Sequence, residues 1–402
     1  MKIKTSAIVY GIRYIRRFGL RTLIIRIIEK KREKDSEYQS FYLETKASLE
    51  QLEKQRMEVS HWNKKEKISI VTPLYHTPAI FLRELIESVL ESSYENWQLC
   101  FADATQDGEE NQIENIVKEY QKMDEKLTGK KSRICYKKLS QNYGIAENTN
   151  QALAMAEGDY IAFLDHDDII TPDALYEMAL AAKCAKKTGK EANMFYSDED
   201  KVNENRTAFF EPHFKPDFNV DLLRSNNYIT HFFVVRTSLI RQVGGFRREY
   251  DGAQDYDFIF RCTEAAKKIC HIPEVLYHWR THQASTADNP ASKMYAFEAG
   301  KRAIEAHLKR QGVEGTVSHT KDLGFYQVEY PVQGTPRVSV LIPNKDQKDT
   351  LKQCLDSVFS KTTYCNYEVI IIENNSQEKE TWEYYEELKK RNNVKIVIWE
   401  SG

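Results

Sequence analysis

The chain contains the stretch Lys67-Ile68-Ser69-Ile70-Val71-Thr72-Pro73, in which a short apolar run is stopped by a threonine and a proline. A run of this length and composition is typical of a buried β-strand. A helix-like segment follows at 81–90, and a second apolar strand at 97–102 ends in Asp103. Strands that alternate with helices predict βαβ units and a parallel sheet.

The alternation continues downstream of Asp103. We expect a helix, a strand, a second helix and a second strand over 113–120, 133–137, 145–156 and 160–164. In open α/β sheets the ligand crevice lies at the carboxyl ends of the strands. The residues at those ends are therefore the first candidates for function.

One segment near the C-terminus repeats the opening pattern. Arg337–Pro343 is similar to Lys67–Pro73, and Tyr367–Glu373 is similar to Trp97–Asp103, so Glu373 occupies the position of Asp103. The repeat stops after about two βα units, which is too few for a doubly wound domain. We therefore expect a longer protein that is cut at residue 402.

The composition excludes several classes of protein. The chain has 402 residues, 41% hydrophobic and 29% charged, with 16 glycines and 10 prolines, so it is neither an integral membrane bundle nor a fibrous chain. The apolar run Leu23-Ile24-Ile25 is interrupted by Arg26, so we expect neither a membrane span nor a signal peptide. Seven cysteines without a CxxC pair predict a reduced, cytosolic protein without structural zinc.

The net charge of −2 conceals an uneven distribution. Residues 1–34 contain eleven Lys or Arg and two Glu, a balance of +9 that leaves −11 for the rest of the chain. Apolar residues of this basic head recur at helical spacing, as at Ile8, Ile12 and Ile15, which predicts a cationic amphipathic helix on an anionic membrane surface. The alternative is a helix that packs on its own domain. The acidic remainder argues against a nucleic-acid partner.

The chain therefore divides into three predicted regions. Residues 1–65 form a helical N-terminal region, in which the basic head is followed by one polar helix over 36–60. The apolar positions of that helix are Phe41, Leu49, Leu52 and Met57. Residues 66–330 form an α/β domain with a Rossmann-like, mostly parallel sheet flanked by helices, and residues 331–402 form a partial second unit of the same kind.

The segment Phe163-Leu164-Asp165-His166-Asp167-Asp168 places three carboxylates at the end of an apolar strand. Like charges this close repel each other unless a cation lies between them. Such clusters hold Mg²⁺ or Mn²⁺, and substrate phosphates complete the coordination. The alternative is a surface loop that leads into the next helix, but Thr171-Pro172-Asp173 already supplies the start of that helix. We therefore predict a metal site here.

Three further segments are candidates that are weak when taken alone. Asn142-Tyr143-Gly144 precedes a helix, whose N-terminus favours an anion, although it also fits an ordinary loop. Asp255 begins a helix far along the chain, where the helix dipole alone could account for a carboxylate. The cluster Tyr277–His282 holds His and Arg side chains that could contact metal or phosphate, or could serve packing.

In order and spacing over roughly residues 67–285, these elements together resemble the nucleotide-sugar-dependent glycosyltransferases of family 2, which have the GT-A fold. The residues that carry the resemblance are Ile70–Tyr75, Asp103, Asn142, Gly144, Phe163–Asp168, Gly244-Gly245-Phe246, Gln254-Asp255 and His278-Trp279-Arg280. The segments 196–201 and 214–217 and the basic head are also similar to those of large bacterial members that build surface polysaccharides of the O-antigen, capsule or rhamnan type, often with two transferase domains in tandem.

The resemblance implies a role for each matching residue. The donor-binding residues would be Thr72, Pro73, Asp103, Asn142, Gly144, Asp165 and Arg280. The ligands of Mn²⁺ or Mg²⁺ would be Asp165, Asp167 and His278. Asp255 would be the general base, and His282 would also approach the metal or the diphosphate. The chain departs from the family at Asp103, which stands alone where paired acids are usual, and at His76, where Asn is usual.

The implied reaction is an inverting, metal-dependent transfer of a sugar from a nucleotide-diphosphate donor to a glycan or polyprenyl-linked glycan acceptor in bacterial surface polysaccharide synthesis. We expect the protein in the cytoplasm, peripheral on the inner face of the plasma membrane. The partial second unit ends before any equivalent acidic cluster, so we expect no transferase activity from it.

Two other functions compete with this one. A nucleotidyltransferase of sugar phosphates could share the sheet and the acids, but residues 73–78 form no basic, glycine-rich phosphate loop. A non-catalytic, membrane-associated assembly protein is the other alternative. A dehydrogenase is disfavoured because no GxGxxG follows a strand.

Overall fold

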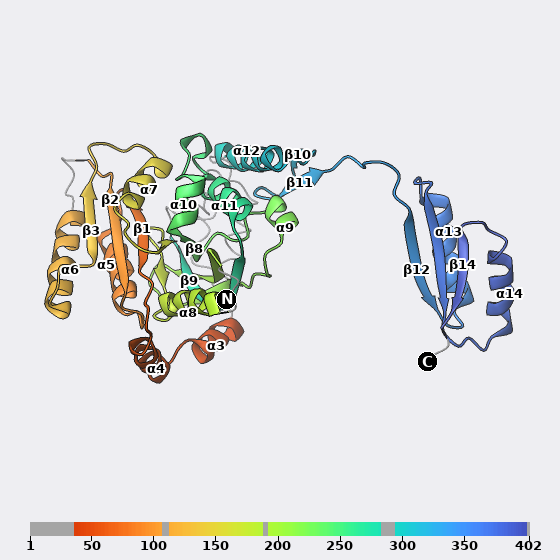
Figure 1. The fold of residues 1–402 in the computed structure, drawn as a ribbon, viewed down its shortest axis with the longest axis horizontal. Helices are drawn as coiled ribbons and strands as arrows, with labels where there is room; N and C mark the ends of the chain where they lie inside the picture. The colour runs from red at the N-terminus through yellow and green to blue at the C-terminus, as the bar shows by residue number, and fades with distance from the viewer. Residues whose placement is uncertain (1–35, 107–111, 188–191, 283–293, 400–402) are drawn as a thin grey trace, which may run out of the picture. The chain divides into compact units, whose positions relative to one another are not determined.

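Figure 1 shows the protein as a computed structural model, which describes residues 36–106, 112–187, 192–282 and 294–399. The chain folds into two compact units, Met1–Glu329 and Tyr330–Gly402. The boundary predicted from the repeat lies between residues 330 and 331. The predicted basic head lies outside the described residues. Among the helices of the described ranges, none is both long and apolar enough to cross a membrane.

The first unit is built on a large β-sheet with the strand order β3-β2-β1-β4-β8-β6-β9-β5, in which β7 also pairs with β6. The strands are β1 (Ile68–Leu74), β2 (Trp97–Asp103), β3 (Ile134–Lys138), β4 (Tyr160–Phe163), β5 (Ile169–Ile170), β6 (Met194–Asn203), β7 (Phe209–His213), β8 (Phe233–Arg236) and β9 (Ile269–Thr281). Strands β1 to β4 are parallel, and so are β6 and β9. Within the described sheet, β5, β7 and β8 run the other way. The predicted α/β fold with a mostly parallel sheet is confirmed.

Two hydrophobic cores form, one on each face of this sheet, because side chains alternate along a strand. In β1, Ile70 and Leu74 enter the first core and Val71 enters the second. The helices of the first core are α5 (Ala79–Leu90), α6 (Gln112–Thr128) and α8 (Ala174–Lys187). Those of the second are α7 (Ile145–Leu153), α10 (Thr237–Val243), α11 (Gln254–Ala265) and α12 (Met294–Gln311). The alternation directs Thr72 toward the first core and Pro73 toward the opposite face.

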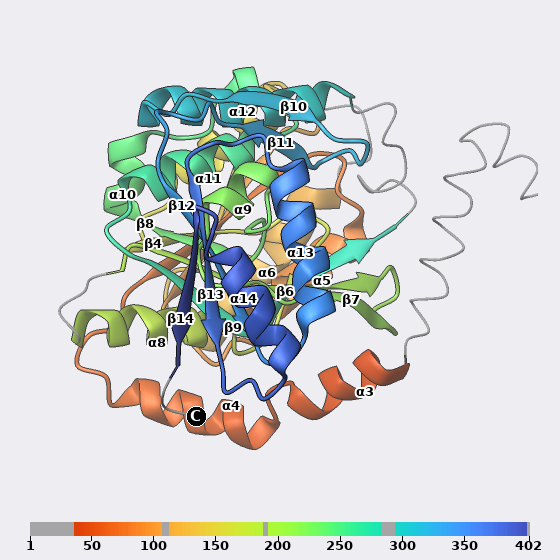
Figure 2. The ribbon, with the colours of Figure 1, turned by 90° about the vertical axis from the view of Figure 1, so that its right-hand side faces the viewer.

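The remaining elements of the first unit are short. They are α9 (Val220–Ser225), the 3-10 turn η1 (Arg248–Tyr250) and the hairpin of β10 (Thr316–His319) with β11 (Tyr326–Glu329). Figures 1 and 2 both show α12 at one end of the first unit and the N-terminal helices α3 and α4 at the other.

The N-terminal region contains two helices, α3 (Ser36–Thr45) and α4 (Leu49–Ser60), so the prediction of one helix over 36–60 is wrong. Ser48 caps α4 and forms a reciprocal capping box with Gln51, which starts a new helix at that point. The predicted apolar face is also wrong except at Leu52. Phe41, Leu49 and Met57 are exposed, and the buried side chains are Tyr38, Tyr42, Leu52 and Val59.

The second unit is a three-stranded parallel sheet with the order β12-β13-β14. Its elements are β12 (Val338–Asn344), α13 (Lys348–Lys361), β13 (Tyr367–Glu373), α14 (Lys379–Leu388) and β14 (Val394–Ile398). Leu355 and Tyr385 from the two helices pack on Val369 and Ile371 to form a small core. On the other face of the sheet, Leu341 is 60% exposed.

Candidate active site

A cleft of about 460 Å³ lies beside the carboxyl ends of β1 and β4. It is lined by Pro73, by Asp165 and Asp167 of the loop after β4, and by Asp255 in the first turn of α11. Small-molecule sites typically have volumes of about 300–1,000 Å³. The cleft therefore brings together an acidic loop and a distant aspartate in a space large enough for a small ligand.

The acidic loop is held in shape by β9. The hydroxyl of Tyr277 donates to Oδ2 of Asp168 at 2.5 Å, and the backbone N–H of Arg280 donates to Oδ1 at 2.7 Å. Asp168 is fully buried, whereas the side chain of Asp165 is 54% exposed. The loop therefore presents one accessible carboxylate next to one buried carboxylate.

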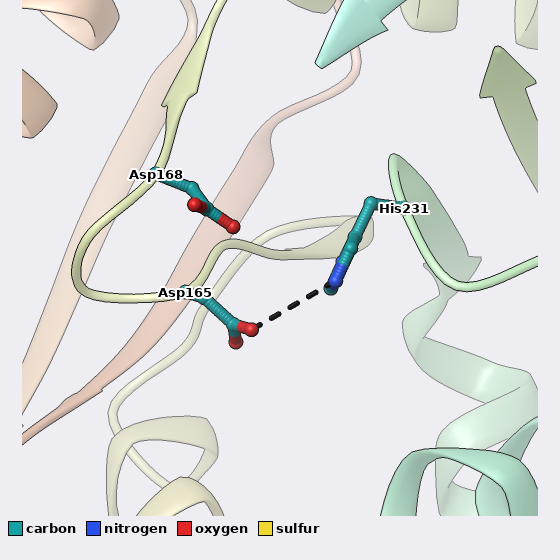
Figure 3. A group of neighbouring side chains, drawn as sticks. All are labelled: Asp165, Asp168 and His231. Carbon is teal, nitrogen blue, oxygen red and sulfur yellow. Dashed lines mark ion pairs between the residues drawn. The ribbon is translucent and has the colours of Figure 1, made fainter. Parts of the chain in front are cut away.

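His231, which precedes β8, completes a group with these two acids. Its Nε2 lies 3.8 Å from Oδ2 of Asp165, and its ring stacks on Tyr277 with 4.5 Å between the centroids. Figure 3 shows how Asp165, Asp168 and His231 face one another. One potential ligand atom from each of the three lies within 4.8 Å of the other two.

The charges of this group favour a cation. Burial raises the pKa of Asp168 well above its ordinary value, and the negative charges of Asp167 and Asp165 add to the shift. A divalent cation between these oxygens would relieve that repulsion. Carboxylate oxygens are the ligands that Mg²⁺ and Mn²⁺ prefer, and imidazole is also a common metal ligand. The residues present therefore fit a metal of this type.

Asp167 lines the same cleft, but its carboxylate has a partner. Nε2 of His282 lies 2.9 Å from Oδ2 of Asp167. Burial acts to raise the pKa of Asp167, but the hydrogen bond to His282 and the nearby ring of His166 outweigh it and lower that pKa. We refer to Asp165, Asp168 and His231 as the candidate metal group. Asp167 lines the same cleft as Asp165, and its partner is His282, which was also predicted to approach the metal. Their role as ligands stays a prediction.

His278 does not belong to the cleft, which corrects its assignment as a metal ligand. Its Nδ1 lies 2.5 Å from Oδ1 of Asp200, and its Nε2 lies 3.0 Å from the hydroxyl of Tyr42, so both ring nitrogens are taken. The reason is the alternation of side chains along β9. Trp279 lines the cleft, and the residues on either side of it point to the other face of the sheet.

Arg280 supports the loop from behind, which corrects its assignment as a donor-binding residue. Its guanidinium is fully buried, and its Nε donates to the backbone oxygen of Asp167 at 2.6 Å. It also pairs with Glu84 of α5 at 2.7 Å and lies over the ring of Phe81. A buried arginine with these partners fixes the acidic loop and has no contact with the cleft.

Asp255 lies in the first turn of α11 and faces the cleft that also contains Asp165. The side-chain amide of Asn227 donates to its Oδ2 at 2.8 Å. Burial raises the pKa of Asp255; the charge of Asp165 adds to this shift and His231 opposes it. The structure therefore places this carboxylate where the sequence-based mechanism needs it, and its role as a base stays a prediction.

Two predicted donor-binding residues are buried behind the cleft. Oδ1 of Asp103 accepts the N–H of Thr105 at 2.9 Å, and Oδ2 accepts the hydroxyl of Tyr136 at 2.7 Å and the ammonium of Lys138 at 3.2 Å. Thr72 is fully buried, and within the described residues its hydroxyl has no hydrogen-bond partner. Neither side chain lines the cleft, so their predicted contacts with a donor find no support in the geometry.

Asn142 and Gly144 shape the turn before α7. Oδ1 of Asn142 accepts the N–H of Gly144 at 3.0 Å and the amide of Asn148 at 2.8 Å. Gly144 has φ +92°, and a Cβ there would lie 2.8 Å from Oδ2 of Asp251. The other oxygen of Asp251 accepts the N–H of Ala146 in the first turn of α7. The anion at this helix N-terminus is thus a carboxylate of the chain itself.

The sequence analysis missed His231 and Asn227. Both lie in the long connection between β7 and β8, where no motif marks them. The one sequence signal is the apolar run after His231, which forms β8. This strand pairs antiparallel with β4, with Phe163 opposite Phe233. It therefore begins beside the end of β4, which brings His231 to the acidic loop. That pairing cannot be read from local sequence.

A sequence model of the family described as "Glycosyl transferase family 2" matches residues 69–244 and 339–402, more than half of the chain. The uncharacterized protein y4gI of Sinorhizobium fredii is 38% identical over 325 residues, which are 80% of this chain and 34% of that protein. The O-antigen biosynthesis protein RfbC of Myxococcus xanthus is 36% identical over 341 residues, 84% of this chain and 25% of that protein. The chain thus spans about a third of one relative and a quarter of the other. Among solved structures, S. aureus TarS 1-349 aligns with a TM-score of 0.44 and 19% identity over 60% of this chain and 65% of that chain.

Proposed function

Because the chain belongs to glycosyltransferase family 2, we propose that its first unit transfers a sugar from a nucleotide-diphosphate donor to a hydroxyl group of a glycan, with inversion at the anomeric carbon. The observation that carries the proposal is that Asp255 shares one cleft with Asp165 while lying on a different element. A site for such a transfer needs two separated functions, one for the leaving diphosphate and one for the attacking hydroxyl.

The leaving group would occupy the side of the cleft that holds Asp165, Asp168 and His231. These three residues would hold Mn²⁺ or Mg²⁺, which when bound supplies positive charge for the departing diphosphate. Tyr277 and the backbone N–H of Arg280 keep Asp168 in place by donating to its two oxygens. The loop is thereby fixed before any ligand binds.

The attacking hydroxyl would lie next to Asp255. A carboxylate whose pKa is raised by burial is a better base near neutral pH than an exposed one, because its pKa lies closer to the pH at which the reaction runs. Asp255 would take the proton as the acceptor oxygen bonds to the anomeric carbon. A base on the side opposite the leaving group leads to inversion.

The test of this proposal is Asp255→Asn in the full chain, which keeps the shape of the side chain and removes its proton affinity. We expect release of nucleoside diphosphate from the donor to fall by about 10²- to 10⁴-fold, while donor binding persists. Turnover and binding are measured with a panel of UDP-, GDP- and dTDP-sugars in the presence of Mn²⁺. Asp221→Asn is the matched control, because Asp221 is an exposed carboxylate on α9. Full turnover by the Asp255→Asn protein would disprove the proposal.

We further propose that the acceptor belongs to surface polysaccharide synthesis and is a glycan or polyprenyl-linked glycan at the cytoplasmic face of the plasma membrane. The support is the similarity to an O-antigen biosynthesis protein and the +9 charge of residues 1–34. A basic segment of this kind binds anionic lipid surfaces. We expect the chain to float with anionic vesicles and to lose that property when residues 1–34 are removed. Unchanged flotation after the removal would contradict the membrane role.

A further inference from the structure

Asn227 lies between α9 and β8, and its side chain contacts the candidate base. We infer that Asn227 is a positioning residue that fixes the orientation of the Asp255 carboxylate for transfer. The inference rests on the proposed function, because it assigns a second residue to the same proton transfer. Its basis is the 2.8 Å hydrogen bond from the Asn227 amide to Oδ2 of Asp255.

The orientation of the Asn227 amide follows from the chemistry of its partner. An ionised carboxylate is an acceptor only, so the NH₂ group of Asn227 must face it. The carbonyl oxygen of Asn227 is then buried, and it has no hydrogen-bond partner among the described residues. An amide that is buried with one end unsatisfied lowers the stability of the fold. An amide that served only the fold would be expected to have both ends paired.

The neighbouring residues show that the segment does not need Asn227 as an anchor. The amide of Asn226 donates to the backbone oxygen of Gly324 at 3.0 Å. The hydroxyl of Tyr228, which is buried, accepts the N–H of Asn219 at 3.0 Å. The chain on both sides of Asn227 is thus held by other contacts. Among the described residues, the hydrogen bond of the Asn227 side chain goes to the carboxylate of Asp255.

The chemistry of the pair suits a general base. The Asn227 amide acts together with the backbone N–H groups of Asp255 and Tyr256, which also hydrogen-bond this carboxylate, and restricts its rotation. A carboxylate has about four acceptor positions, so one is left for the acceptor proton. The neutral amide of Asn227 makes its hydrogen bond without the charge of a lysine or arginine, which would lower the pKa of the carboxylate much further. Small errors in the placement of reacting groups cost up to about 10²-fold in rate. We therefore expect loss of this bond to slow transfer without weakening donor binding.

The experiment compares Asn227→Leu, which keeps the branching at Cγ and removes the donor, with Asn227→Gln, which keeps an amide. In the full chain, with the panel of UDP-, GDP- and dTDP-sugars and Mn²⁺, we expect Asn227→Leu to lower kcat about 10- to 100-fold. The KM for the donor should stay within about threefold, and Tm should not fall, because an unsatisfied buried oxygen is removed with the amide. Asn227→Gln should recover part of the lost kcat.

Asn226→Ala is the matched control for a purely structural contact. It should lower Tm and leave kcat unchanged. In the Asp255→Asn background, Asn227→Leu should have no further effect, because residues that act as a unit are not additive. The inference is overturned if Asn227→Leu leaves kcat within twofold, or if it lowers Tm and kcat together and Asn227→Gln restores neither. If Asp255→Asn itself turns over normally, or the unmodified chain consumes no sugar nucleotide, the proposed function fails and this inference fails with it.

Discussion

Each unit contains a strand–helix–strand pattern, which is β1–α5–β2 in the first and β12–α13–β13 in the second. The two strands of each pattern pair in parallel with the same register. Ile68 to Leu74 lie opposite Trp97 to Asp103 in one, and Val338 to Asn344 lie opposite Tyr367 to Glu373 in the other. Both patterns end in a fully buried acid that closes the following turn. In the first unit, however, the candidate metal group and Asp255 come from the loops after β4, before β8 and at the start of α11. The comparison shows that the residues of the candidate site lie outside the strand–helix–strand pattern that the two units share.

The buried acids themselves sharpen this comparison. Asp103 is bonded to Thr105, Tyr136 and Lys138, and Glu373 accepts the hydroxyl of Tyr385 at 2.5 Å and that of Ser376 at 2.7 Å. In both units the carboxylate is buried and hydrogen-bonded within its own unit. The position therefore has a structural role in both units, and a contact with a donor would be additional to it.

The largest effect that tests the comparison should come from Asp165→Ala. Removing the exposed carboxylate of the candidate metal group should lower sugar-nucleotide consumption by about 10²-fold or more, because a bound divalent cation supplies several kcal/mol of charge stabilisation. The Mn²⁺-dependent rise in Tm with nucleoside diphosphate should also disappear. Both are measured on the full chain.

The control for this prediction lies in the second unit. Asp356→Ala removes an exposed carboxylate of α13 that pairs with Lys352, and it should change neither measurement. If Asp165→Ala kept a metal-dependent response to nucleoside diphosphate, a second binding site would have to exist.

A smaller effect should distinguish the two units at the same face of the repeated sheet. Val71 is buried in the second core of the first unit, whereas Leu341, at the same position of the repeat, is 60% exposed. We expect Val71→Ala to lower the free energy of unfolding of the first unit by about 2 kcal/mol and Leu341→Ala to change that of the second by less than about 0.5 kcal/mol. Urea unfolding followed by hydrogen exchange of β1 and β12 reports each unit separately. An equal cost at Leu341 would show that this face is covered in solution.

The strands could be predicted because buried parallel strands are continuous apolar runs. The predicted strands 133–137 and 160–164 lie within one residue of β3 and β4, and the repeat located β12 and β13. The helix α3 could not be predicted in the same way. Its buried face consists of Tyr38 and Tyr42, whose hydroxyls bond Asp200 and His278 far along the chain, so an apolar pattern selected Phe41 instead.

Residues of the site could be predicted where a sequence motif marks them. They could not be predicted where the pairing of two distant strands brings them together. The acidic loop and Asp255 were found from their motifs, and they share the cleft. His231 was missed because an antiparallel strand, not a motif, brings it to Asp165. His278 and Arg280 were assigned to the site from the resemblance and from the polar cluster Tyr277–His282. Both lie on the opposite side of β9 from Trp279, which lines the cleft, because side chains alternate along a strand.

The smallest predicted effect concerns one position at which the two repeats differ in charge. In the first unit, Ser69 donates to Gln98 at 2.7 Å; in the second, Ser339 donates to Glu368 at 3.0 Å, and Arg337 and Lys395 pair with the same carboxylate at 2.9 Å. The second repeat thus has a network of ions where the first has a neutral one.

The hydrogen bonds from Lys395 and Ser339, with the charge of Arg337, lower the pKa of Glu368 below its ordinary value in the folded state. A lowered pKa stabilises the fold above the unfolded value, and that stability is lost as the pH falls through the folded value. Glu368→Gln should therefore remove part of the acid sensitivity and the salt dependence of the second unit, and the effect should be small because both cations are more than half exposed. Tm measured between pH 3 and 7 at low and high salt tests this, with Glu383→Gln as an exposed control on α14. If Tm of Glu368→Gln fell with pH as steeply as Tm of the unchanged chain, the ion pairs of Glu368 would make no contribution to stability. The ionic network of the second unit and the neutral network around Gln98 would then be equivalent in stability.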